Sequence, residues 1–201
     1  MGGANLRKAN FRYSNFCRAD FNGCQLDGTD FEASDLSHAT FPYAKSYSTA
    51  FYDVANFQYA KLCHADMNTS LFDRGNFCKA DLSHANCWRT ILQNANFYSA
   101  TLVEVDFRSA QLQNSTFLEA NLTGADLRWA KLDGVNFSKA DLNNVNFSEA
   151  EFGNADFTEA IGLTEEQVRA ASNWGRATYS EDLCRQLGLR QQANNSNAAE
   201  G

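Results

Sequence analysis

The chain has 201 residues, of which 24 are acidic and 17 basic, giving a formal net charge of −7. An acidic surface repels nucleic acid and anionic lipid, which argues against non-specific binding to either but leaves room for a local basic patch. No apolar run is long enough to span a bilayer, and no signal-peptide core is evident. The length suits one domain, with two as the upper bound.

Residues 4–160 follow a period of five. From Phe57 to Phe157 every fifth residue is Phe, Leu, Met or Cys, and the residue two before each of these centres is small. The same rule holds for the centres from Leu6 to Phe41. This period fits neither a helix, which repeats about every 3.6 residues, nor a simple strand, which repeats about every two.

Strand alternation explains the pattern, because residues two apart point to the same side of an extended chain. The centre and the small residue before it therefore point inward, and the remaining residues turn a corner. A chain that turns in the same sense every five residues closes into a coil, and stacked coils bury centres that one coil would expose.

The number of sides follows from residue identity at a spacing of twenty. The centres 57, 77, 97, 117, 137 and 157 are all Phe, and the centres 62, 82, 102, 122 and 142 are all Leu. This recurrence predicts a square tube of about eight four-sided coils with like residues stacked inside.

At this point a family resemblance becomes clear. The segments "ANLTGADL" (120–127) and "SKADLNNVNF" (138–147) resemble the A(D/N)LXX signature of the pentapeptide-repeat family. The resemblance implies an all-β solenoid over residues 4–160, a right-handed quadrilateral β-helix. Its handedness is implied by the family and does not follow from the spacing.

The register changes once, in "YAKSYSTAFYDVANF" (43–57), where the later centres are displaced by one residue. A one-residue bulge at a corner would account for this, and solenoids tolerate such bulges. The alternative is a protruding functional loop. One extra residue favours the bulge.

After Ala160 the pattern stops, and residues 161–190 are predicted to form a helical cap. "TEEQ" (164–167) is a capping box that starts a helix expected to run to about Asn173. A second short helix starts at Ser180, with Leu183 and Leu187 on one face and Gly188 at its end.

These helices, with Trp174 and Tyr179, are expected to cover the last coil, whose open edge would otherwise invite end-to-end stacking. Residues 191–201 are expected to be a flexible tail. The segment 162–189 resembles the C-terminal cap of cyanobacterial and chloroplast members of the family, which bears on lineage more than on activity.

The sequence gives no sign of catalysis. No GxGxxG, P-loop or GxSxG pattern occurs, and the aspartates one before a centre are explained by the repeat. The six cysteines include no CxxC pair and no zinc-ligand spacing, so we expect reduced thiols, no cofactor and no enzyme.

One column of side chains suggests weak metal binding or joint titration. His64 and His84 are twenty residues apart and therefore stack on adjacent coils, and Glu104 extends the column. Imidazole and carboxylate groups about 4.8 Å apart suit a transition metal. The alternative is a pair of exposed corner histidines with no role.

An outward patch of tryptophan and arginine suggests a binding surface. Its members are Trp88, Arg89, Arg108, Arg128 and Trp129, on one side of three successive coils. Tryptophan and arginine are enriched in binding hot spots, and we expect a basic, aromatic patch on an acidic protein. The alternative is cation–π stacking that only decorates the surface.

Two further contacts are expected for a partner or a second copy of the chain. Leu71 and Ile91 lie twenty apart at outward positions where Asn or Asp is usual. The N-terminal coil around Leu6 and Phe11 has no helix to cover it, so either the chain is processed or truncated, or a partner covers that end.

These features predict a non-catalytic, rigid scaffold that binds another protein and no nucleic acid, in a photosynthetic complex or its assembly. The expected compartment is the cytoplasm or plastid stroma, or the thylakoid lumen if the chain is a processed form. The family resemblance implies an alternative, a DNA mimic that binds DNA gyrase and protects it from quinolones.

Overall fold

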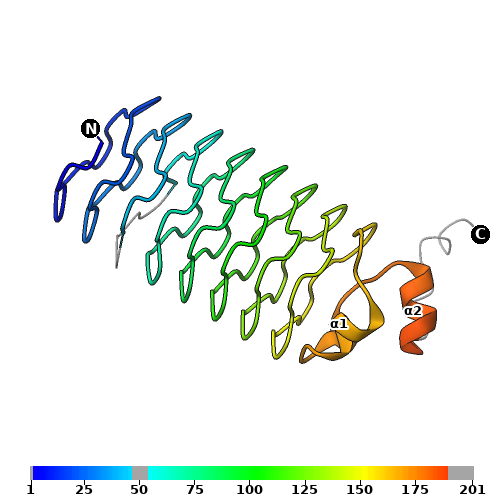
Figure 1. The fold of residues 1–201 in the computed structure, drawn as a ribbon. Coiled ribbons are helices and arrows are strands. Elements are labelled where there is room, and N and C mark those ends of the chain that lie inside the picture. Colours follow the sequence, from blue (N-terminus) through cyan, green and yellow to red (C-terminus); the bar gives the residue numbers. More distant parts are fainter. Residues whose placement is uncertain (1, 47–53, 190–201) are drawn as a thin grey trace, which may run out of the picture.

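The structure, a computed structural model, describes residues 2–46 and 54–189. The chain winds into a rod of stacked coils, with two helices at its C-terminal end (Figure 1). Parallel bridges join residues one coil apart, such as Asn5 to Gln25 and Asn136 to Asp156. A coil therefore has four sides of five residues, which confirms the prediction from residue identity.

Each side is too short for an extended strand, because the corner uses two of its five residues. At each corner the carbonyl of a centre accepts the N–H three residues later, as in Ala65 to Leu62 at 3.0 Å. The residue two after the centre has a positive φ, 56° at His64, a conformation that costs a non-glycine residue about 1–2 kcal/mol. The N–H of that residue offsets the cost by donating to the next coil, at 3.0 Å from His64 to the Ser83 carbonyl.

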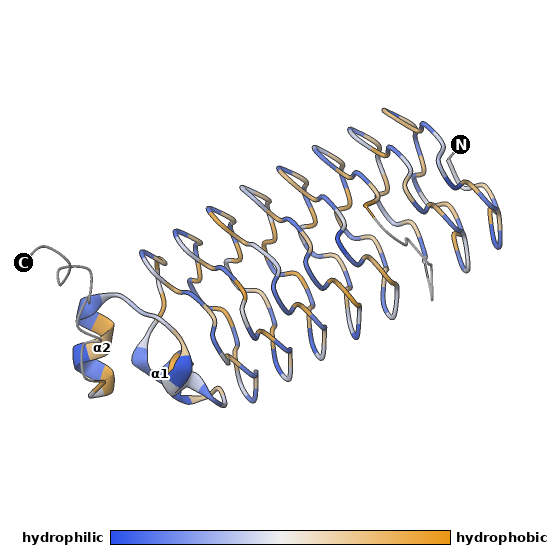
Figure 2. Ribbon diagram, turned by 180° about the vertical axis from the view of Figure 1, so that it is seen from behind, coloured by the Kyte–Doolittle hydropathy of each residue, from blue (hydrophilic) through white to orange (hydrophobic). Residues whose placement is uncertain are grey.

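Inward positions form ladders of identical side chains. Phe97 stacks on Phe77 with centroids 4.9 Å apart and on Phe117 at 4.6 Å, with ring planes nearly parallel. Figure 2 shows hydrophobic and hydrophilic segments alternating around the coils. Among the described residues, no buried side-chain N or O atom lacks a hydrogen-bond partner. Inward Ser and Thr thus fit the core; Ser115, for example, donates to the Leu112 carbonyl at 2.6 Å.

The one-residue displacement is visible in the pairing. Asp35 bridges Asn56, Thr40 bridges Lys61 and Lys45 bridges Asp66, each 21 residues apart, whereas both flanking regions pair at 20. The extra residue therefore lies between 46 and 56. The choice between a bulge and a protruding loop falls largely on residues 47–53, outside the described residues.

The cap contains α1 (Glu165–Arg169), a 3-10 helix (Trp174–Arg176) and α2 (Glu181–Leu187). The predicted capping box at Thr164 and Gln167 is confirmed, as are the Ser180 N-cap and the left-handed Gly188. The expected extent of the first helix to Asn173 is wrong. The helix stops at Arg169 because the chain rejoins the tube, where Ser172 bridges Glu151.

The cap continues the tube rather than only lying on it. Thr178 bridges Asp156, and the Tyr179 ring stacks on Phe157 with centroids 5.5 Å apart and planes 4° apart. Leu183 and Leu187 of α2 are buried, as predicted. Tyr179 thereby serves as the last ring of the phenylalanine ladder. Residues 191–201, expected to be a flexible tail, lie outside the described residues.

Candidate protein-interaction face

Where an Asp or Asn stands one before a centre, it has a structural role. Its Oδ1 accepts the backbone N–H two residues later, at 3.1 Å from Trp88 to Asn86 and 3.0 Å from Arg108 to Asp106. This bond satisfies a corner N–H that no other coil reaches, which gives a physical reason for the A(D/N)LXX pattern. Acidic residues at these positions are therefore explained by the fold.

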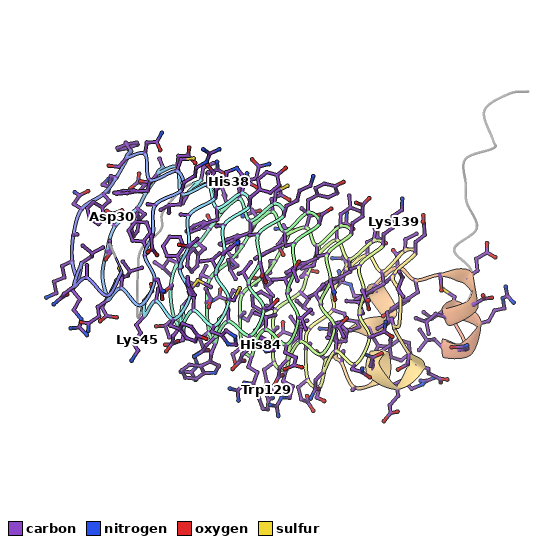
Figure 3. All side chains as sticks on the ribbon, turned by 45° about the horizontal axis from the view of Figure 1, so that its top comes forward. Asp30, His38, Lys45, His84, Trp129 and Lys139 are labelled. Atoms are coloured by element: carbon purple, nitrogen blue, oxygen red, sulfur yellow. The ribbon has the colours of Figure 1, made fainter. Side chains whose placement is uncertain are left out.

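The five predicted patch residues lie on one side of the tube. Asn86 bridges Asp106, which bridges Asp126, so their coils are adjacent. We call this side of the tube, over the four coils that begin with Asp66 and end with Trp129, the tryptophan face. Its outward side chains are Asp66, Asn68, Thr69, Asn86, Trp88, Arg89, Asp106, Arg108, Ser109, Asp126, Arg128 and Trp129. In Figure 3 the labelled His84 and Trp129 lie along one flank of the rod, opposite His38 and Lys139.

Two of the three arginines are ion-paired within the face. Arg108 binds Asp106 through Nε at 2.9 Å and an Nη at 2.6 Å, and Arg128 binds Asp126 at 2.9 and 2.7 Å. Burial opposes ionisation of Asp106, but the hydrogen bonds from the Arg108 side chain and backbone outweigh it and lower the pKa of Asp106. The patch is thus less basic than expected. The two ion pairs could have been predicted from the sequence, since each of these arginines follows an Asp by two residues.

The tryptophans are covered by guanidinium groups but remain accessible. The Arg89 guanidinium carbon lies 4.4 Å from the Trp88 ring centroid, and that of Arg128 lies 5.4 Å from the Trp129 centroid. Trp129 is 53% exposed, an unusual fraction for so large a side chain. The face therefore presents apolar surface with cations held over it.

The predicted histidine column forms the edge of the same face. The His64 and His84 rings stack at 4.9 Å with planes 5° apart, and His84 Nδ1 lies 3.3 Å from Glu104 Oε2. Tyr43 extends this stack beneath His64 at 5.3 Å. Tyr43 and His64 are 21 residues apart, so counting in twenties missed this pair.

The metal hypothesis for His64, His84 and Glu104 finds no support in this geometry. Imidazole lone pairs lie in the ring planes, and two parallel planes 4.9 Å apart do not converge on one ion. Across residues 2–46 and 54–189, no group of three His, Cys, Asp or Glu side chains is arranged to hold a metal. The column is a ring stack that ends in a contact between His84 and Glu104.

The other predicted contacts are placed but not joined to this face. Leu71 bridges Ile91 on the adjacent side of the tube, and both are partly buried. Leu6 and Phe11, in the first described coil, are also partly buried. Neither set contacts the tryptophan face, so each stays a separate prediction.

Two of the cysteines have thiols that ionise less readily than usual. All six are free thiols, and burial with a hydrogen bond to Asp81 raises the pKa of Cys63 to about 11. Burial likewise raises the pKa of Cys87. A cleft of about 510 Å³ opens between α1 and the last coil, and its lining mixes polar residues such as Asn143, Asn144 and Glu166 with the apolar Val145 and Phe147. No helix in the described ranges is both long and apolar enough to cross a membrane.

Comparisons with solved structures find several proteins to which this chain is similar. The plasmid-mediated fluoroquinolone resistance protein QnrB1 is 18% identical, with 94% of this chain and 99% of that chain covered and a TM-score of 0.48. HetL, involved in heterocyst differentiation regulation in the cyanobacterium Nostoc sp. strain PCC 7120, is 21% identical over 90% and 91%, with a TM-score of 0.29. A pentapeptide repeat protein of the Arabidopsis thaliana thylakoid lumen is 31% identical over 44% and 72%, with a TM-score of 0.35.

No curated protein matches the sequence. The family model for pentapeptide repeats does match, in eight copies over residues 1–44, 55–86, 80–117 and 120–158. This match identifies the repeats for which the signature implies a right-handed quadrilateral β-helix. With most of the chain matched and four-sided coils along the whole tube, the chain belongs to the pentapeptide repeat family.

Proposed function

We propose that this protein is a non-catalytic, rigid scaffold that binds another protein through the tryptophan face. The observation that carries the proposal is the set of outward side chains that the repeat does not need. Asp106 and Asp126 bond the corner N–H groups, whereas Trp88, Arg89 and Trp129 have no such role. Large aromatic and arginine side chains in exposed positions are the common anchors of protein interfaces.

Rigidity makes this face suitable for docking. Neighbouring coils lie about 4.8 Å apart and are joined on every side by backbone hydrogen bonds, such as Arg89 to the Arg108 carbonyl at 2.9 Å. The side chains are therefore held at fixed spacing before a partner arrives. A preordered surface loses less conformational entropy on binding, which favours affinity.

The resemblance of segment 162–189 to cyanobacterial and chloroplast caps supports a photosynthetic setting. The scaffold would then serve a photosynthetic complex or its assembly, in the cytoplasm or stroma, or in the thylakoid lumen of a plastid or cyanobacterium. The partner is a protein of that compartment.

A second candidate is the gyrase-binding DNA mimic, which the net charge of −7 favours. The tryptophan face works against it, because its centre holds three arginines beside three aspartates where a DNA mimic needs continuous negative charge. A supercoiling assay with gyrase and a quinolone separates the two: a scaffold leaves gyrase inhibition unchanged, and a mimic relieves it.

The direct test is a pull-down from a photosynthetic lysate, quantified by mass spectrometry. The Trp88→Ala, Arg128→Ala double variant should keep its fold, because both side chains point outward. Its binding free energy for the specific partner should be weaker by about 2 kcal/mol or more. Tyr98→Ala with Lys139→Ala, on the opposite side, is the matched control and should keep the partner. A partner list and yield that are unchanged in the first variant would refute the proposal.

A further inference from the structure

Arg89 differs from the other two arginines of the tryptophan face in its electrostatic surroundings. Arg108 and Arg128 each direct their guanidinium fork at an aspartate of their own coil. The coil of Arg89 has Asn86 at the equivalent position, and an amide offers no charge to pair with. The Asn86 side chain instead donates to Asp66 at 2.9 Å, so it also occupies an oxygen of that carboxylate.

The neighbours of Arg89 in its own column are neutral. Thr69 lies in the coil before it and Ser109 in the coil after it, and the backbone bonds from Thr69 to the Trp88 carbonyl and from Arg89 to the Arg108 carbonyl fix that order. Among the described residues of the tryptophan face, Arg89 is the arginine that forms no ion pair with a carboxylate. It is also exposed to solvent.

Its geometry favours a planar anion. The guanidinium lies over the Trp88 ring at 4.4 Å, which covers one of its faces but leaves its N–H edge for an acceptor. A carboxylate bound edge-on by arginine forms charge-assisted hydrogen bonds, the stronger class in proteins. The Trp88 indole offers an apolar contact in the coil of Arg89, and the Trp129 indole offers a second one two coils, or about 9.6 Å, further along the axis.

The same face disfavours a polyanion. Asp66, Asp106 and Asp126 run along its centre, and Glu104 stands at its edge beside His84. A second or third negative charge on a ligand would meet these carboxylates rather than a free cation. The electrostatics of the face therefore suit one acidic group in an otherwise apolar segment.

From this arrangement we infer that the partner presents a protein segment with a single Asp or Glu among apolar or aromatic residues, and that Arg89 binds that carboxylate. The inference rests on the proposed function and names the chemistry of its partner. A run of acidic residues or a nucleic acid would not satisfy it.

The test is selection of a random peptide phage library on the folded protein, followed by binding assays with the enriched peptides. Arg89→Ala is the test variant. Arg18→Ala is its control, because Arg18 occupies the same corner position, with a φ of 62° against 54°, on another side of the tube. Trp88→Ala reports whether the selected peptides use the tryptophan face at all.

We expect the selection to enrich peptides with one acidic residue flanked by apolar ones. These peptides should bind the Arg89→Ala variant about tenfold or more weakly than the unchanged protein, and should bind the Arg18→Ala variant with unchanged affinity. Changing that acidic residue to its amide should cause a similar loss. Enrichment of acidic runs, or peptides that depend on Trp88 but not on Arg89, would overturn the inference and leave the proposed function standing. Peptides indifferent to Trp88→Ala would count against both.

Discussion

In the coils from Phe57 to Phe157 each side bonds through its backbone to the same side of the next coil. Above the last coil, Ser172 and Thr178 continue these backbone bonds on two sides, whereas on another side a side chain makes them. The Gln167 side chain donates to the Val145 carbonyl at 2.8 Å and to the Leu142 carbonyl at 3.2 Å. In the tube a backbone N–H fills the first role, as Asp126 does to the Val105 carbonyl at 3.0 Å. The tube is therefore stabilised by repetition, whereas one side of the cap depends on a single side chain.

This difference predicts opposite sensitivities to change. In a tube of equivalent coils, each coil is held by many similar contacts, so the loss of one contact leaves most of the others in place. Removal of a buried ring still opens a local cavity. The cap depends on single residues for which no second copy exists. The predictions below test the contrast, beginning with the largest expected effect.

Deletion of residues 164–201 should cause end-to-end association or insolubility, because it uncovers Phe157 and the backbone edge of the last coil. Size-exclusion chromatography with light scattering measures the outcome. Deletion of 190–201 alone is the control and should leave the protein unchanged. A soluble, monodisperse 164–201 deletion would show that the helices are not a cap.

Phe97→Ala should lower the free energy of unfolding by roughly 3–5 kcal/mol, because it opens a cavity between two stacked rings. Urea denaturation provides the measurement. Phe97→Leu is the control and should cost less, since leucine already fills the centres of another column. A loss below about 1 kcal/mol for Phe97→Ala would contradict the ladder.

Gln167→Ala should cost about 1–3 kcal/mol, because the Val145 carbonyl loses the donor that Gln167 supplies and the Leu142 carbonyl keeps only the Val145 N–H. Gln167→Glu separates this role from the capping box, since a carboxylate still accepts the Thr164 N–H but donates nothing to carbonyls. We expect both variants to be destabilised in urea titrations. A fully stable Gln167→Glu would mean that the capping box, not the donation, matters.

Acid should weaken the tube through its paired aspartates. Burial opposes ionisation of Asp81, but hydrogen bonds from Ser83 and Cys63 prevail and lower its pKa. A lowered folded-state pKa adds stability above the unfolded value, about 3.9, which is lost as pH falls through the folded-state value.

The Tm should therefore drop as pH falls below about 4. Asp81→Asn keeps the oxygen that accepts the Ser83 N–H, and its Tm should fall slightly less steeply across that range. Thermal melts between pH 2 and pH 7 compare the two proteins. Equal slopes would show that Asp81 contributes nothing through its charge.

Much of the tube could be predicted, because its rules are local. Phe97, Leu102 and their inward neighbours follow from a period of five and an identity at twenty, and both rules need only the sequence. Tyr179 could not be placed in the same ladder, because the residues between it and Phe157 follow no period. Its position depends on how the cap closes the tube.

The candidate face shows the same division. Spacing placed Trp88, Arg108 and Trp129 on one side, but spacing says nothing of how side chains turn once they are there. The Arg108–Asp106 pair changes the charge of the patch, and it depends on a rotamer choice between solvent and a nearby carboxylate. The ring stack of His64 on Tyr43 was not predicted for another reason, because the register changes between these two residues.

The bridge spacing of 20 residues also makes the coil a unit of length. Removing one whole coil between Trp88 and Trp129, such as residues 97–116, would rejoin equivalent sides and preserve every kind of inward contact. It would shorten the distance between the two indoles by one coil, about 4.8 Å, without changing either residue. In such a protein the spacing of two recognition groups is adjustable in discrete steps, so a lineage could refit the face to a new partner by gaining or losing twenty residues.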